Sequence, residues 1–190
     1  MTVDLLIVGP ASRDTGGVAR YVTEQRRVLP ADVRTRVFDV RTPPGSGAVR
    51  FFLAVLVSLV DALRFPFRSR PDVVHVHSSH RFAFYRASYF VFVAAYVWRR
   101  PIVLHVHGSG FDDFVASPPR HVSWLQGAVF RACDRVIALS PYWKDVLDER
   151  VPGEKVVVVP NAVDPGQYDP ETGADPPRIV FVSNLIERKG

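Results

Sequence analysis

The sequence contains a single cysteine, Cys133, among its 190 residues. One thiol excludes an intrachain disulfide framework and any zinc site that needs several thiolates from this chain. Lysine is also scarce, with three residues beside 21 arginines. Apolar residues make up 47% of the chain and charged residues 23%, a balance typical of a globular protein and not of a disordered one. The length predicts one domain with at most a piece of another.

Hydrophobic runs long enough to cross a bilayer are absent. Phe51–Val60 ends at Asp61, and Ala87–Trp98 lies between arginines. Both runs are shorter than the ~20 apolar residues that a spanning helix needs, so they predict buried or surface-lying helices. Met1 leads directly into the apolar run Val3–Val8 with no basic segment before it, which is atypical of a signal peptide. We therefore expect a cytoplasmic protein.

Positive charge is concentrated in the first half of the chain. Residues 1–100 contain 15 arginines and 7 acidic residues, whereas residues 101–190 contain 9 basic and 12 acidic residues. This asymmetry predicts an anionic partner. Basic residues are scattered and aromatics lie within apolar runs, so we expect no nucleic acid. The segment Arg50–Arg70 combines apolar side chains with arginines, which is typical of a helix lying on the inner face of an anionic membrane. A core-packed helix with solvated ends fits the same pattern.

Short apolar runs alternate regularly with segments of helical spacing. Runs this continuous are typical of parallel strands buried on both faces. The alternation predicts an α/β fold with a doubly wound, Rossmann-like parallel sheet. The expected strands are Val3–Val8, Val33–Val40, Asp72–His77, Ile102–His107, Arg135–Leu139 and Lys155–Val159. The expected helices are Gly17–Leu29, Ala48–Leu63, Arg81–Arg99, His121–Arg131 and Tyr142–Arg150.

Proline and glycine then interrupt the alternation. Five prolines and two glycines lie between Pro160 and Pro177, which indicates a linker. After it, Arg178–Val182 resembles a strand and residues 187–190 the opening of a helix. We therefore predict a Rossmann-like domain over residues 1–160, a linker over 161–177, and the first strand and turn of a second domain over 178–190.

Gly16 and Gly17 lie directly before the first expected helix. Glycines at a helix N-terminus let backbone N–H groups approach an anion, so this loop is a candidate phosphate site. It matches neither the dinucleotide-binding glycine pattern nor a Walker A loop. A simple turn and helix start is an equal alternative.

Two H-x-H motifs end two of the expected strands, as His75-Val76-His77 and His105-Val106-His107. Residues two apart in a strand share a face, and open α/β sheets bind ligands at the strand C-termini. His77 and His107, nearest the strand ends, are the predicted ligand-binding residues. His75 and His105 are expected to be buried, hydrogen-bonded residues of the core.

A metal-dependent hydrolase is an alternative interpretation of these histidines. It needs further ligands on later strands, and Asp134 and Asp164 are the only loose candidates. We therefore expect no metal.

The loop after the second motif adds Gly108, Ser109 and Gly110, followed by Asp112 and Asp113. Glycines here free the backbone, and Gly108 and Ser109 are candidates for binding sugar or acceptor hydroxyls. The two aspartates fit a helix cap or a solvated loop better than a catalytic role.

Taken in order, these segments resemble the N-terminal half of a retaining GT-B glycosyltransferase of family 4, also called group 1. The resemblance is carried by Gly16-Gly17, Asp72–His77, His107-Gly108, Val136–Ser140, Val159–Asp164 and Leu185 with Lys189-Gly190. It implies two Rossmann-like domains facing a cleft, with the acceptor on the N-terminal domain and a nucleotide-sugar donor on the other.

The resemblance also implies roles for individual residues. Gly16 and Gly17 approach the donor diphosphate, and His107 contacts the transferred sugar as the catalytic residue. Lys189 neutralises the departing diphosphate in place of a metal ion, so neither metal nor other cofactor is expected. Ser183-Asn184-Leu185 departs from the usual Gly-Arg-Leu, which removes one diphosphate-binding cation.

The expected function is transfer of a hexose, with retention, from a nucleotide sugar to a glycan or lipid-linked acceptor, as in polysaccharide biosynthesis. The chain ends before the donor-binding domain, so we expect it to be inactive alone. A non-catalytic carbohydrate- or phosphate-binding module and the metal-dependent hydrolase are the alternatives.

Overall fold

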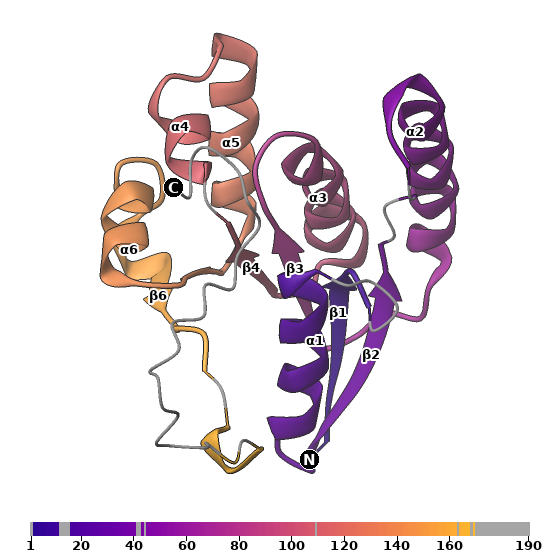
Figure 1. Ribbon diagram of the computed structural model, residues 1–190, viewed down its shortest axis with the longest axis vertical. Coiled ribbons are helices and arrows are strands. Elements are labelled where there is room, and N and C mark those ends of the chain that lie inside the picture. The colour runs from indigo at the N-terminus through magenta and orange to yellow at the C-terminus, as the bar shows by residue number, and fades with distance from the viewer. Residues whose placement is uncertain are drawn as a thin grey trace, which may run out of the picture.

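The computed structural model contains a six-stranded, all-parallel sheet with the strand order β2-β1-β3-β4-β5-β6 (Figure 1). It describes residues 2–11, 16–40, 43, 45–108, 110–162, 164–167 and 169. The strands are β1 (Val3–Gly9), β2 (Val33–Asp39), β3 (Val73–Ser78), β4 (Ile102–Val106), β5 (Arg135–Ala138) and β6 (Val156–Val158). All six expected strands are present, and the predicted Rossmann-like α/β fold is confirmed.

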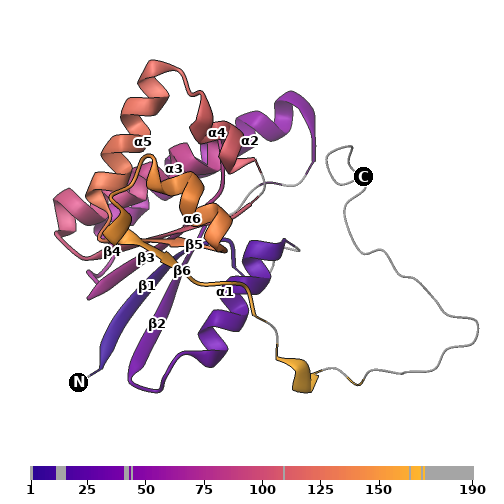
Figure 2. The same cartoon turned by 90° about the vertical axis from the view of Figure 1, so that its left-hand side faces the viewer.

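The helices divide unequally between the two faces of the sheet. They are α1 (Gly17–Val28), α2 (Gly47–Arg64), α3 (Phe82–Phe92), α4 (Phe111–Ala116), α5 (Arg120–Ala132) and α6 (Pro141–Asp148). Figure 2 shows α1 on one side and the other helices on the opposite side. Because crossovers between parallel strands are right-handed, the chain changes face when it changes direction along the sheet. That reversal lies between β1 and β3, where open α/β sheets bind ligands.

The main core lies between the sheet and the helical layer of α3 and α5. Alternate strand residues point toward it, and its buried members include Val74, Val76, Ile102, Leu104 and Val136. The intervening residues point to the α1 side. On this side a smaller apolar cluster of Leu5, Ile7 and Val22 packs under α1, and the C-terminal halves of β3 and β4 carry histidines.

Two elements differ from the expected pattern. The helix predicted over 81–99 is α3 followed by a π-helix, η2 (Val93–Trp98), which ends at Arg99 in the left-handed region with φ 56°. Helix α4 was not predicted because six residues are too few for a periodic signal. Asp112 and Asp113, expected as a cap or loop, lie in its first turn, where carboxylates favour the positive end of the helix dipole.

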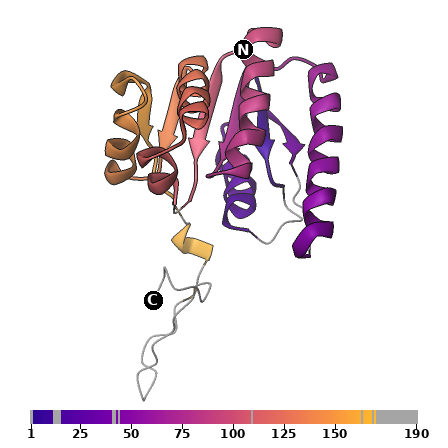
Figure 3. The ribbon, with the colours of Figure 1, turned by 90° about the horizontal axis from the view of Figure 1, so that it is seen from above.

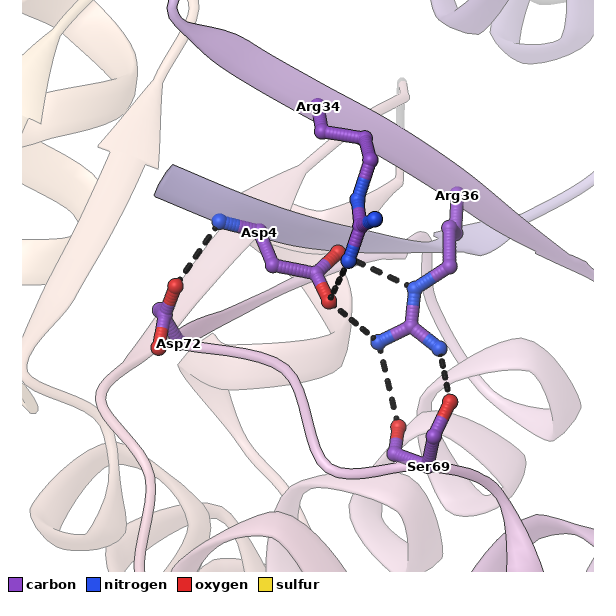
Figure 4. A network of polar contacts seen from close by, with 5 residues as sticks. All are labelled: Asp4, Arg34, Arg36, Ser69 and Asp72. Carbon is purple, nitrogen blue, oxygen red and sulfur yellow. Dashed lines mark hydrogen bonds and ion pairs between the residues drawn. The ribbon is translucent and has the colours of Figure 1, made fainter. Parts of the chain in front are cut away.

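A polar network fastens the segment after α2 to the N-terminal edge of the sheet (Figure 4). Arg36 binds the Asp4 carboxylate through two nitrogens, with Nε–Oδ1 3.0 Å and Nη2–Oδ2 2.8 Å. Arg34 also reaches Asp4 Oδ2, at 3.2 Å. Arg36 then donates to the Ser69 carbonyl oxygen at 3.1 Å, and the Asp4 N–H donates to Asp72 Oδ2 at 2.9 Å. The chain between α2 and β3 is therefore held against β1 and β2.

The predicted domain boundaries are only partly covered by the described residues. The sheet ends with β6, and a 3-10 turn, η4 (Pro165–Gln167), falls within the predicted linker. Residues 170–190, including the predicted strand Arg178–Val182, lie outside the described residues. Within the described part, no helix combines the length and apolarity needed to cross a membrane.

Candidate functional site

A cavity of ≈170 Å³ opens at the C-terminal edge of the sheet, between β1 and β3. This is the point where the strand order reverses. The residues lining it are Val8, Gly9, Pro10, Val18, Val40, His77, Ser78, Ser79, Ala83, Arg86, Ala87 and Phe90. Whole-ligand pockets enclose about 300–1,000 Å³. The cavity therefore suits one part of a ligand, such as a single sugar ring or phosphate.

Gly9, the last residue of β1, makes room for His77 on the neighbouring strand. A Cβ at Gly9 would lie 3.2 Å from His77 Cβ and 3.3 Å from His77 Cδ2. A Cβ here would require the His77 side chain to shift by a few tenths of an ångström. The sequence analysis missed Gly9; a glycine closing a strand run was the available signal.

The two H-x-H motifs form one cluster of four imidazoles. His77 and His105 are register partners on β3 and β4, and His77 Nδ1 lies 2.8 Å from His107 Nε2. The rings of His105 and His107 stack with centroids 4.0 Å apart. The predicted burial of His75 and His105 is confirmed, and His77 and His107 are buried as well. The predicted shared face is confirmed.

Helix α1 covers this cluster with two of its side chains. The Tyr21 ring lies against three histidines, with centroid distances of 4.8 Å to His105 and 5.2 Å to His107. One turn later, Gln25 Nε2 lies 2.9 Å from His75 Nδ1. Because an amide nitrogen only donates, His75 accepts at Nδ1 and carries its proton on Nε2. Tyr21 and Gln25 were not predicted, although their i, i+4 spacing places them on one helix face.

Burial keeps these histidines neutral. Desolvation lowers the pKa of His107 to about 4. It lowers the pKa of His75 to about 4 and that of His105 to about 2, with a further decrease from the neighbouring His107. For His77 the pKa lies well below the usual value, because burial and the three other histidines disfavour its cation. At neutral pH each ring therefore offers one donor and one acceptor nitrogen.

Several buried nitrogens of the cluster have no hydrogen-bond partner among the described residues. They are His75 Nε2, His77 Nε2 and both ring nitrogens of His105. The prediction of a hydrogen-bonded His105 is therefore wrong for the described part of the chain, whereas that for His75 is confirmed. Each buried polar group without a hydrogen-bond partner lowers the stability of the fold by about 1–3 kcal/mol. A polar ligand group that hydrogen-bonds these nitrogens would remove that cost.

The cluster also provides a test of the metal interpretation. One nitrogen from each of His75, His77 and His105 can be chosen so that all three lie within 4.8 Å. The His75 ring is inclined by 20° to His77 and 10° to His105. However, the Nδ1 atom of His75 is already engaged by Gln25, and no carboxylate among the described residues joins the three histidines. The cluster therefore offers nitrogen ligands without the acidic ligand that the hydrolase interpretation requires.

The two carboxylates considered for the hydrolase alternative lie elsewhere. Asp134 Oδ2 accepts a hydrogen bond of 2.8 Å from the Ile102 backbone N–H at the N-terminal edge of the sheet, opposite the histidines. Asp164 Oδ1 accepts one of 3.0 Å from the Gly166 N–H after β6. The structure brings neither to the cluster.

Gly16 and Gly17 begin α1 as predicted, Gly16 as the N-cap and Gly17 as the first helical residue. A Cβ at either position would meet no heavy atom within 4 Å in the described chain. Neither glycine has a positive φ. Neither packing nor backbone conformation in the described chain therefore requires glycine at these positions. A physical role for the missing side chains is to leave the N-terminus of α1 open to a ligand.

Gly108 is different, because the backbone itself requires it. Its φ is +101°, a conformation that side chains with a Cβ rarely adopt. This turn lies directly after β4 and His107. Of the other predicted site residues, Ser109 and Lys189 lie outside the described residues.

Arg86 on α3 is the one charged side chain among the described residues that line the cavity. The sequence analysis did not select it, because one arginine in an apolar helix carries no motif. Together with Ser78, Ser79 and His77, it gives the cavity a polar wall facing the apolar wall of Val8, Val40 and Phe90.

The fold and the site define a class: a Rossmann-like α/β domain with a small polar cavity where its strand order reverses. The sequence profile of Glycosyltransferase Family 4 matches residues 15–167, which includes the whole histidine cluster. The chain belongs to this family. The family resemblance expected from the ordered motifs is confirmed.

Solved structures also resemble this chain. One is the UDP-N-acetylglucosamine 2-epimerase from Rickettsia bellii, with 11% sequence identity and a TM-score of 0.44. The similarity covers 83% of this chain and 44% of the epimerase, so the chain spans less than half of that protein's length. No curated protein matches the sequence.

Proposed function

We propose that this chain is the acceptor-binding half of a retaining glycosyltransferase that moves a hexose from a nucleotide sugar to a glycan or lipid-linked acceptor. The supporting observation is the cavity between β1 and β3, lined by His77 and Arg86, in a chain of Glycosyltransferase Family 4. The non-catalytic module lacks a comparable observation, and the histidine group that a hydrolase would use has no acidic ligand among the described residues.

In this proposal His107 hydrogen-bonds a hydroxyl of the transferred sugar. Its lowered pKa keeps the ring neutral at pH 7. The contact with His77 Nδ1 engages Nε2 and sets the ring orientation, so one partner donates and the other accepts. A neutral ring held in one tautomer is suited to positioning a polyol, since each hydroxyl also donates and accepts.

The N-terminus of α1 would receive the donor diphosphate. The positive end of the helix dipole and the free N–H groups of its first turn favour an anion. The open space beside Gly16 and Gly17 permits the close approach that such binding needs. Lys189 is proposed to neutralise the leaving group, with no metal ion taking part.

The cavity itself would hold part of the acceptor. Arg86 supplies a positive charge, while Ser78 and Ser79 supply hydroxyls beside His77. The apolar wall suits the hydrophobic face of a sugar ring.

A transfer assay tests this function. The full-length protein is incubated with a panel of nucleotide sugars and sugar or lipid-linked acceptors, and the product anomer is determined by NMR. We expect a retained configuration and undiminished turnover in EDTA. Sugar binding without turnover would instead establish the non-catalytic module. Activity that EDTA abolishes, on substrates without a nucleotide, would establish the hydrolase.

A further inference from the structure

Helix α2 exposes most of its large apolar side chains. It has 18 residues and none of them is buried. The half-buried positions are a mixture of small, polar and apolar residues, Ala54, Val57, Ser58, Val60, Asp61 and Ala62. The exposed large apolar side chains form an outward stripe. They are Val49, Phe51, Phe52, Leu53, Val55, Leu56, Leu59 and Leu63, continued after the helix by Phe67.

Helix α2 is attached to the domain through its C-terminal end, although most of its large apolar side chains are exposed. Tyr89 Oη on α3 donates to the Ala62 carbonyl oxygen at 2.5 Å, and Trp98 Nε1 donates to the Pro66 carbonyl oxygen at 3.2 Å. Phe65, directly after α2, is fully buried. The network around Asp4 then holds Ser69 and Asp72 (Figure 4). The orientation of α2 is therefore set from its C-terminal end.

The charges around the stripe have one predominant sign. Arg50 and Arg64 lie on the exposed surface of α2, and Arg68 and Arg70 follow on the chain that leaves it. Between residues 46 and 70 the only acidic residue is Asp61. An apolar stripe bordered by arginines is complementary to a lipid surface, where acyl chains lie beneath anionic headgroups.

We propose that α2 lies in the interface of an anionic membrane, with its outward stripe, from Val49 to Leu63, inserted among the acyl chains and its arginines at the phosphates. Figure 3 shows α2 along the outer edge of the helical layer beside α3. The described chain leaves the sheet at β6, the edge opposite β2, so the segment after β6 starts far from this stripe. A second copy is disfavoured because pairing two such stripes brings arginines of one sign together.

Vesicle co-sedimentation of the full-length protein tests the proposal. We expect binding to vesicles containing phosphatidylglycerol, little binding to pure phosphatidylcholine, and weaker binding as salt is raised. Arg64→Gln and Arg70→Gln should each lower the partition coefficient about fivefold. The double substitution Leu56→Gln/Leu59→Gln should abolish binding. Arg26→Gln and Val28→Gln, on exposed positions of α1, are the matched controls and should bind as the native protein does.

A fluorescent label then reports directly on insertion. Cys133, the single native cysteine, is buried, and desolvation raises its pKa to about 12, so a thiol-reactive dye will label only an introduced cysteine. An environment-sensitive dye on Leu59→Cys should shift to the blue with anionic vesicles, whereas the same dye on Val28→Cys should not.

Three results would overturn the proposal. They are no binding to anionic vesicles at low salt, equal binding of the Leu56→Gln/Leu59→Gln variant with unchanged circular dichroism, and a lipid-independent dimer that this variant dissociates. None of these readouts depends on glycosyl transfer, so the membrane surface and the proposed function can fail separately.

Discussion

His77 Nδ1 and His107 Nε2 lie 2.8 Å apart and join the C-terminal ends of β3 and β4. The two residues are 30 positions apart in the chain, and each is the second histidine of an H-x-H motif. Their hydrogen bond lies beside the cavity, beneath Tyr21 of α1. This site and the network that supports the sheet lead to five predictions.

If His107 contacts the transferred sugar as proposed, His107→Ala should lower kcat about tenfold to a hundredfold and change the donor KM much less, because a contact strengthened in the transition state acts on kcat. Steady-state kinetics of the full-length enzyme provide the measurement. His75→Ala should be less damaging, since His75 is bonded to Gln25 away from the cavity. Equal loss of kcat in a folded His75→Ala protein would contradict this assignment.

Gly17→Ala should separate binding from stability. Alanine is favoured over glycine within a helix by about 1 kcal/mol, and the added methyl meets no atom of the described chain. Thermal unfolding should therefore occur at an equal or higher Tm, while the donor KM rises because the methyl occupies the proposed diphosphate position. An unchanged donor KM would remove Gly17 from the donor site.

Gly108→Ala is the matched comparison and should destabilise the protein. Its φ of +101° is unfavourable for alanine by roughly 1–2 kcal/mol. Chemical denaturation measures the free energy of unfolding. A Gly108→Ala protein as stable as the native one would show that this turn relaxes without cost.

Acid should destabilise the protein between about pH 6.5 and pH 4. An unfolded histidine has a pKa of about 6.5, whereas burial lowers the folded values of His75 and His107 to about 4. The unfolded chain therefore binds more protons in this window. Stability is complete above pH 6.5 and falls with decreasing pH, by up to about 1.4 kcal/mol per pH unit for each histidine.

Denaturation curves across this range, with His105→Leu as the variant, provide the check. His105 is buried and both its nitrogens lack partners among the described residues. Leucine at this position should flatten the pH dependence with little loss at pH 7. His121→Gln on the exposed surface of α5 is the control. If the free energy of unfolding of His105→Leu depended on pH as steeply as that of the native protein, the His105 ring would not be excluded from water.

Asp4→Asn should lower the free energy of unfolding by about 1–3 kcal/mol, because it removes the carboxylate shared by Arg34 and Arg36. Glu24→Gln breaks the exposed pair with Arg27 and should change stability by less than about 0.5 kcal/mol. Similar effects of the two substitutions would mean that the network at Asp4 is no stronger than a surface ion pair.

Much of the fold was predictable because its strands are buried on both faces. Such strands require unbroken runs like Val3–Val8 and Ile102–His107, and these runs differ from the surrounding helical spacing without any tertiary information. Period-two geometry likewise placed His105 and His107 on one face. Short elements carry no such signal, and α4 was missed for that reason.

The candidate site was only partly predictable. Motif residues His77 and His107 were found because they end strand runs. Gly9, Tyr21 and Arg86 were not, since each takes part only through a neighbour distant in sequence. Adjacency of β1 and β3 brings Gly9 against His77, and packing of α1 brings Tyr21 over the rings.

The sequence by itself determined which residues share a strand or helix face, because backbone geometry sets the periods of 2.0 and 3.6 residues. Only the tertiary structure decided which way each face points. The apolar stripe of α2 has the same pattern whether it faces a core or solvent. Anchoring by Phe65, Tyr89 and the network at Asp4 turns Leu56 and Leu59 outward. Which strands are neighbours was decided in the same way, because pairing depends on where the crossovers place each strand and not on its own residues.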